Sequence, residues 1–218
     1  SQVAVTNSIS NPRNDFEVNA LGTVNLLEAA RESNRCPIVV FSSSNKVYGG
    51  LVGARIAFED GGYRLSDLPF GVPEEWPLDF CSPYGCSKGA ADQYVRDYAR
   101  IYGLRTVVFR QSCIYGPRQF GNEDQGWLAH FAISAMLGQP IKIYGDGYQV
   151  RDILYVSDLV QAFDRAVERI EIARGKVYNL GGGPRHTVSI RQLLETLETS
   201  LGRRQEVVYA DWRPGDQR

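Results

Sequence analysis

Two side chains with acid–base potential are four residues apart in the segment Tyr84-Gly85-Cys86-Ser87-Lys88. If this segment is helical, Tyr84 and Lys88 share a face, because positions i and i+4 are neighbours on a helix. A free tyrosine titrates at about 10, and a nearby positive charge favours its phenolate. The pair therefore predicts a tyrosine acid–base group tuned by a lysine. Ordinary solvated helices show the same spacing, so the pair alone does not define a catalytic site.

Three consecutive hydroxyl residues, Ser42, Ser43 and Ser44, follow the apolar run at 38–41. Ligands of open α/β sheets bind beyond the carboxyl ends of the strands. The hydroxyls are therefore placed to orient an alcohol group of a substrate. Capping of an ordinary turn explains the same residues equally well.

The segments around these residues alternate between helix and strand patterns, with a Gly- and Pro-rich loop at 49–82. Such alternation predicts an α/β protein with a parallel sheet covered on both faces. Helices are expected at 15–33, 84–102, 127–137, 156–169 and 189–201, and strands at 38–41, 104–110, 141–144 and 176–180.

The composition is that of an average globular protein, with 218 residues, 43% of them hydrophobic, and a net charge of -1. No basic patch indicates nucleic acid or anionic lipid as a partner. No apolar run approaches the ~20 residues of a membrane helix. The four cysteines form no C-x-x-C pair, which predicts no metal site and a cytoplasmic protein with reduced thiols.

Several motifs in order along the chain resemble extended short-chain dehydrogenases that act on nucleotide sugars. They cover nearly the whole chain, and the ordered set is far more specific than any single motif. The motifs are Val18-Asn19-Ala20-Leu21-Gly22-Thr23, the strand end at 42–49, Ser82-Pro83-Tyr84 to Lys88, Phe109-Arg110-Gln111 to Pro117, Gln149-Val150-Arg151-Asp152, Asn179-Leu180-Gly181-Gly182 and Arg213-Pro214-Gly215-Asp216.

This resemblance implies a Rossmann-like doubly wound parallel sheet, NAD as cofactor, and a role for each matching residue. The sheet is expected to lack its N-terminal strands and to carry a smaller interleaved lobe. We expect a partial NAD-binding domain at 1–115 and a substrate lobe mainly at 116–218, with 153–180 returning to the first domain. The implied catalytic residues are Tyr84, Lys88 and Ser44; the cofactor contacts are Asn19, Ser42, Tyr84, Lys88 and Gln111; the substrate contacts are Ser44, Gln125, Trp127, Arg151, Arg213 and Asp216.

The two residues after Ser44 distinguish between the reactions that members of such a family catalyse. Its dehydratases carry an Asp-Glu pair at the positions that Asn45 and Lys46 occupy here. Epimerisation needs no such pair, so an epimerase is favoured. A finer resemblance is to the CDP-paratose 2-epimerase group, from the segments at 44–49, 115–120, 124–127 and 216–218. It implies transient oxidation of a CDP-sugar at C2 and return of the hydride to the other face.

Several alternatives stay open at this stage. One is a UDP-sugar 4-epimerase or another nucleotide-sugar epimerase or dehydratase, and another is a reductase that releases its oxidised product. A third is a truncated, non-catalytic fragment that binds nucleotide sugar. No Gly-rich turn for the NAD pyrophosphate precedes residue 15, which favours a truncated chain. The resemblance also implies a homodimer.

Overall fold

The computed structural model describes residues 1–59 and 61–213 of the chain. These residues divide into two compact units. Unit 1 comprises Ser1–Val52, Val72–Ser112 and Ser157–Leu180. Unit 2 comprises Gly53–Gly71, Cys113–Val156 and the residues from Gly181 onward. No helix of the described part is long and apolar enough to cross a membrane.

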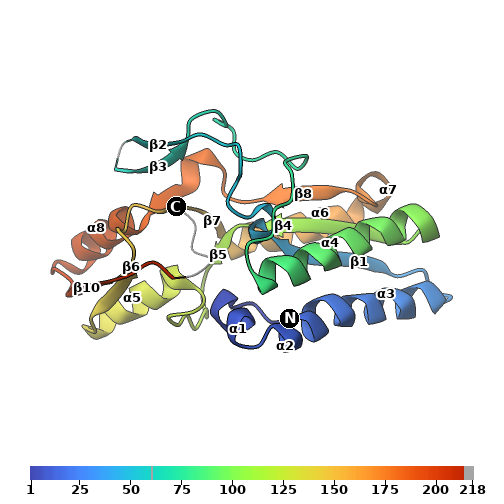
Figure 1. Cartoon of the computed structure of the whole chain (residues 1–218), viewed down its shortest axis with the longest axis horizontal. Helices are drawn as coiled ribbons and strands as arrows, with labels where there is room; N and C mark the ends of the chain where they lie inside the picture. Colours follow the sequence, from blue (N-terminus) through green and yellow to red (C-terminus); the bar gives the residue numbers. More distant parts are fainter. Residues whose placement is uncertain (60, 214–218) are drawn as a thin grey trace. The chain divides into compact units, whose positions relative to one another are not determined.

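Unit 1 is built on a parallel sheet in the order β1-β4-β8 (Figure 1). The register sets Ser44, at the end of β1, opposite Gln111, at the end of β4. The predicted parallel α/β architecture is thereby confirmed, and β1 extends through all three serines. The strands are β1 (Ile38–Ser44), β4 (Arg105–Gln111) and β8 (Val177–Leu180).

Helices cover both faces of this sheet because side chains alternate along its buried strands. Val108 of β4 packs with Leu27 and Val95 from the helices on one face. Val107 and Phe109 point the other way, into a cluster with the helices of the opposite face. The first face carries α3 (Gly22–Glu32) and α4 (Pro83–Tyr102), and the second carries α6 (Val156–Glu168) and α7 (Ile170–Ala173).

Residues at both ends of helix α4 set where it begins and ends. The hydroxyl of Ser82 accepts a hydrogen bond from the Gly85 amide at 3.0 Å, and Pro83 occupies the first turn. Gly103 ends the helix in the left-handed conformation, at φ 70°. The helix predicted at 84–102 is confirmed.

The helix predicted at 15–33 is interrupted by a π-helical turn, Glu17–Leu21. Asn19 lies in this turn and is buried. A π-helical turn inserts an extra residue and changes the direction of side chains, which a regular apolar period does not reveal. The segment consists of α1 (Val5–Ser10), α2 (Pro12–Phe16), the π turn and α3.

Unit 2 contains a hairpin inside the stretch predicted to be a loop. Its strands pair antiparallel, and the Tyr63 amide donates to the Tyr148 carbonyl at 3.2 Å. The Phe58 ring contacts the Tyr148 ring edge-on at 4.9 Å. We expected residues 53–71 in the first domain; these contacts between residues far apart in sequence place them in unit 2. The hairpin consists of β2 (Ile56–Glu59) and β3 (Gly62–Leu65).

The remainder of unit 2 packs two helices on short strands. Phe131, Ile141, Ile143 and Leu194 form its apolar cluster. The strand β6 and both helices match the predicted segments, whereas the other strands were not predicted. The elements are β5 (Cys113–Tyr115), α5 (Trp127–Leu137), β6 (Ile141–Tyr144), β7 (Val150–Tyr155), β9 (Thr187–Ser189), α8 (Ile190–Leu201) and β10 (Val207–Ala210).

Candidate active site

The end of β1 and the first turns of α4 bring Ser44 and Tyr84 together in unit 1. Both side chains are buried, at 9% and 8% exposure, and they share a hydrogen bond. Helix α4 can approach the turn after β1 closely because Gly85 has no side chain. A Cβ at Gly85 would lie 3.1 Å from the Lys46 carbonyl oxygen. Residues from distant segments of the chain therefore form one hydroxyl pair.

Lys88 lies one helical turn beyond Tyr84 and reaches the same strand end. Its ammonium group donates to the Ser42 carbonyl and sits 4.6 Å from the centre of the Phe41 ring. Only 4% of the residue is exposed. The structure thus brings Tyr84, Lys88 and Ser44 to the carboxyl end of β1.

The protonation of the pair differs from the expectation. Burial raises the pKa of Tyr84; its hydrogen bond with Ser44 opposes this rise, and the negative charge of Asp15 adds to it. Burial also lowers the pKa of Lys88 to about 8, against the opposing charges of Asp15 and Asp92. We expected the lysine charge to lower the pKa of Tyr84, but burial dominates. The buried phenol therefore holds its proton at neutral pH.

Lys88 makes the stability of this chain depend on pH. An unfolded lysine has a pKa of 10.5 and the folded one about 8, so the unfolded state binds more protons between these values. The free energy of unfolding should therefore rise between pH 8 and 10.5. From about pH 7 to about pH 10 we expect a gain of about 2–3 kcal/mol that Lys88→Met lacks. Urea unfolding of both proteins at the two pH values measures it; equal gains contradict the prediction.

The proposed cofactor contacts also lie in unit 1. Asn19 and Lys88 line a cavity of about 250 Å³, together with Phe41. The Asn19 side chain donates to the Gln2 carbonyl at 3.1 Å and to Ser87 at 3.3 Å. Ser42 is exposed. The side-chain nitrogen of Gln111 is buried and has no hydrogen-bond partner within the described part of the chain.

Behind these residues lies a buried ion pair that the sequence did not predict. Arg110 of β4 and Asp92 of α4, 2% and 0% exposed, form two hydrogen bonds of 2.9 and 3.0 Å. Ser43 donates to the same carboxylate at 2.8 Å. The pair fixes the middle serine of the strand end against α4. The only available signal was Arg110 at the end of the apolar run Val107-Val108-Phe109.

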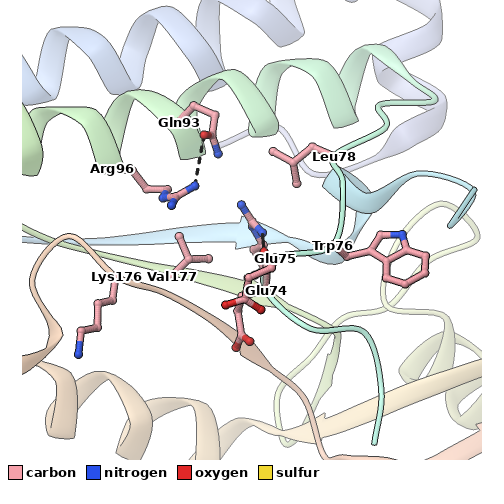
Figure 2. A pocket seen from close by; sticks show the side chains of 9 residues that line it. Glu74, Glu75, Trp76, Leu78, Gln93, Arg96, Lys176 and Val177 are labelled. Carbon is pink, nitrogen blue, oxygen red and sulfur yellow. Dashed lines mark hydrogen bonds between the residues drawn. The ribbon is translucent and has the colours of Figure 1, made fainter. Parts of the chain in front are cut away.

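The same network reaches the end of β8. Arg110 donates to the Tyr48 hydroxyl at 2.8 Å, and Tyr48 donates to the Asn179 side chain at 2.7 Å. The Asn179 amide donates to Glu74 at 2.8 Å. Beside this network is a cavity of about 500 Å³, where Gln93 and Arg96 of α4 face the segment around Glu74 (Figure 2). Three separate motifs of the sequence thus join one polar network.

The expected phosphate-binding arginines belong to unit 2. Arg213 donates to the Glu123 carbonyl at 3.2 Å and stacks over the Tyr144 ring at 4.4 Å. Arg151 donates to the Val150 carbonyl at 2.8 Å. Asp216, the last of the expected substrate contacts, lies outside the described residues.

The other expected substrate residues lie at the start of α5. Gln125 is exposed and pairs with Asn122 through a backbone bridge. Trp127 packs edge-on against Phe131 at 5.9 Å, and its indole N–H is buried without a partner among the described residues. Trp127 therefore has a packing role in unit 2.

Unit 2 also joins two of the sequence motifs. The Asp152 carboxylate accepts hydrogen bonds from the amides of Gly182 and Gly183, at 2.7 and 3.2 Å. A Cβ on Gly181 would lie 1.9 Å from the Asp152 carboxylate oxygen. The triple glycine therefore serves to let β7 approach this loop.

Comparison with known proteins gives the family of this chain. Residues 2–181 match the model of the NAD dependent epimerase/dehydratase family. The chain is 46% identical over 202 residues to the CDP-paratose 2-epimerase of Salmonella typhi, covering 90% of this chain and 60% of that protein. The chain thus spans less than two thirds of the length of this relative.

Two solved structures are similar along the whole chain. The UDP-glucose 4-epimerase of Thermus thermophilus in complex with NAD has a TM-score of 0.81 and 34% identity, covering 99% of this chain and 64% of that one. The Thermotoga maritima UDP-glucose 4-epimerase with UDP-glucose has a TM-score of 0.82 and 30% identity, covering 100% and 64%. On this sequence and structural similarity, the chain belongs to the NAD dependent epimerase/dehydratase family.

Proposed function

We propose that the protein to which this chain belongs is an NAD-dependent nucleotide-sugar epimerase that inverts C2 of a CDP-sugar. The observation that carries the proposal is the meeting of Ser44, Tyr84 and Lys88 at one strand end. The 46% identity to a CDP-paratose 2-epimerase supports the choice of sugar carbon and base.

The side chains support proton transfer at a sugar hydroxyl. The phenolate form of Tyr84 takes the hydroxyl proton as the alcohol becomes a ketone, and the resulting phenol gives it back when the other face is reduced. Because burial raises the pKa of Tyr84, this form is the minor one at neutral pH and the phenol must lose its proton before the oxidation step. Ser44, hydrogen-bonded to Tyr84, orients the sugar oxygen toward the phenol. Asn45 and Lys46 offer no carboxylate for elimination of water, which favours epimerisation over dehydration.

NAD is the proposed cofactor, and when bound it supplies reversible hydride transfer to the sugar carbon. The residues present fit a ligand of this kind. Lys88 and Asn19 border one cavity, and the buried amide nitrogen of Gln111 has an unused donor at the neighbouring strand end, within the described residues. We assign Asn19, Ser42, Tyr84, Lys88 and Gln111 to cofactor contact.

We assign unit 1 to the cofactor and unit 2 to the nucleotide sugar. Arg151 and Arg213 are proposed to pair with the phosphates, because a guanidinium group matches phosphate oxygens in a two-pronged geometry. Gln125, Trp127 and Asp216 are proposed to complete that site. A UDP-sugar 4-epimerase is the second candidate, supported by the likeness to two UDP-glucose 4-epimerases.

A panel of nucleotide sugars tests the proposal on the full-length protein. We expect interconversion of a CDP-sugar and its C2 epimer, measured by chromatography, with no net absorbance change of the nicotinamide. Conversion of UDP-glucose to UDP-galactose alone would favour the second candidate. A stoichiometric absorbance change would indicate a reductase, and no conversion of any sugar by cofactor-loaded protein would contradict both epimerase proposals.

A homodimer in the cytoplasm is also proposed. Leu21, Leu26 and Ile101 leave large apolar surfaces exposed on the neighbouring segments around α3 and α4, as expected for a contact between subunits. The four cysteines are all free thiols, which suits a reducing compartment.

A further inference from the structure

Asp15 of α2 is a buried carboxylate to which the proposed chemistry gives no role. It is 1% exposed. One oxygen accepts a hydrogen bond from the Ser87 hydroxyl, and the other accepts one from the Asn19 side chain at 3.3 Å. Both donors are neutral, so they hold the carboxylate in place without neutralising its charge.

Lys88 is a buried cation whose direct contacts are also with neutral groups. Its hydrogen-bond acceptor is the neutral Ser42 carbonyl, and the ring below it is that of Phe41. An isolated buried ammonium is costly unless an opposite charge lies near it. Ser87, the residue bonded to Asp15, directly precedes Lys88 on α4, which brings the two charges into one neighbourhood.

The other charged groups near Lys88 do not replace Asp15. Asp92, one turn further along α4, is already paired with Arg110 through two hydrogen bonds. On the cavity side, the lining residues within the described part of the chain include no carboxylate. Strand β1 contributes only Phe41 and the Ser42 carbonyl. Asp15 is therefore the carboxylate whose charge is left to balance Lys88.

We propose that Asp15 is the buried counter-ion of Lys88 and a positioning residue for the Tyr84–Lys88 pair. Its charge keeps the ammonium protonated in a desolvated site, and its bond to Ser87 ties α2 to the turn of α4 that carries both residues. The catalytic consequence rests on the function proposed above, whereas the charge pairing does not.

The direction of the electrostatic effect supports this role. The charge of Asp15 raises the pKa of Lys88 and also that of Tyr84. One carboxylate thus shifts both groups in the same sense. Removing its charge should lower both pKa values.

Lysine-selective ¹³C labelling of this chain tests the charge pairing without cofactor or substrate. The chain has four lysines, and Lys88→Arg identifies the signal of Lys88. Its titration midpoint should lie near the pKa of about 8. In Asp15→Asn we expect the midpoint to fall by on the order of one pH unit. An unchanged midpoint in the folded variant overturns the proposal.

Three variants separate charge from packing. Glu17→Gln removes an exposed carboxylate next to the same segment and should leave the midpoint unchanged. Ser87→Ala removes the hydrogen bond but keeps the charge; a shift as large as that of Asp15→Asn would show a packing effect and overturn the proposal. If Asp15→Asn does not fold, Asp15→Ser removes the charge with a smaller side chain that still offers an oxygen to Ser87.

The full-length protein tests the catalytic consequence. Because Asp15 raises both pKa values, Asp15→Asn should move the pH profile of kcat toward lower pH, and Asp15→Glu should restore it. A folded variant with an unmoved profile contradicts the positioning role. Absence of epimerase activity in the unmodified protein would count against the proposed function alone, since the lysine titration still reports on Asp15.

Discussion

Replacing Tyr84 by Phe should lower kcat for epimerisation by about 10²–10⁴-fold in the full-length protein. The aromatic ring still fills its buried place beside Ser44, but no hydroxyl remains to exchange a proton with the sugar. KM should change little, because the phenol acts on the reacting bond more than on the nucleotide. Steady-state kinetics on the CDP-sugar that the panel identifies measures both constants.

Tyr94→Phe is the matched control for this change. Tyr94 lies on the same helix, and half of it is exposed, so removal of its hydroxyl should leave kcat within about twofold. If Tyr84→Phe keeps more than about a tenth of the activity while Tyr94→Phe is normal, the assignment of Tyr84 as the proton-transfer group is wrong.

Replacing Asp92 by Asn should lower the free energy of unfolding by about 3–5 kcal/mol. The change leaves the buried guanidinium of Arg110 without its opposite charge and weakens the bond from Ser43. Because that bond fixes the strand end next to Ser44, proton transfer should weaken as well. Equilibrium unfolding of this chain in urea gives the loss of stability directly.

Asp97→Asn provides the comparison on the same helix. Asp97 pairs with Arg100 at 3.5 Å, but both side chains are more than half exposed. Such a surface pair contributes at most about 1 kcal/mol. A loss below about 1 kcal/mol in Asp92→Asn, equal to that of Asp97→Asn, would contradict the central role of the Arg110–Asp92 pair.

The buried network explains why motifs distant in sequence belong to one site. Tyr48, Arg110 and Asn179 come from three segments, and hydrogen bonds link them in a chain behind the serines. Buried polar groups that are fully bonded specify one arrangement, because any other leaves a donor or acceptor unpaired. The network thus fixes the ends of β1, β4 and β8 relative to α4.

The sequence by itself determined the local elements of the candidate site. Helix α4 and the strands β1 and β4 were predicted because apolar periodicity and the stop at Gly103 are properties of neighbouring residues. The four-residue spacing of Tyr84 and Lys88 placed them on one face of that helix, and the serines marked the strand end that meets them.

Only the tertiary structure decided the partners and the charges. The Asp92–Arg110 pair, the hydrogen bond from Asn19 in the π turn to Ser87 and the bond from the hairpin to Tyr148 each join segments that are apart in the chain. The same holds for the raised pKa of Tyr84, because its cause is burial by the whole of unit 1. A local pattern predicts the face of a helix or strand on which each side chain lies. Desolvation and long-range hydrogen bonds, in contrast, exist only once the chain is folded.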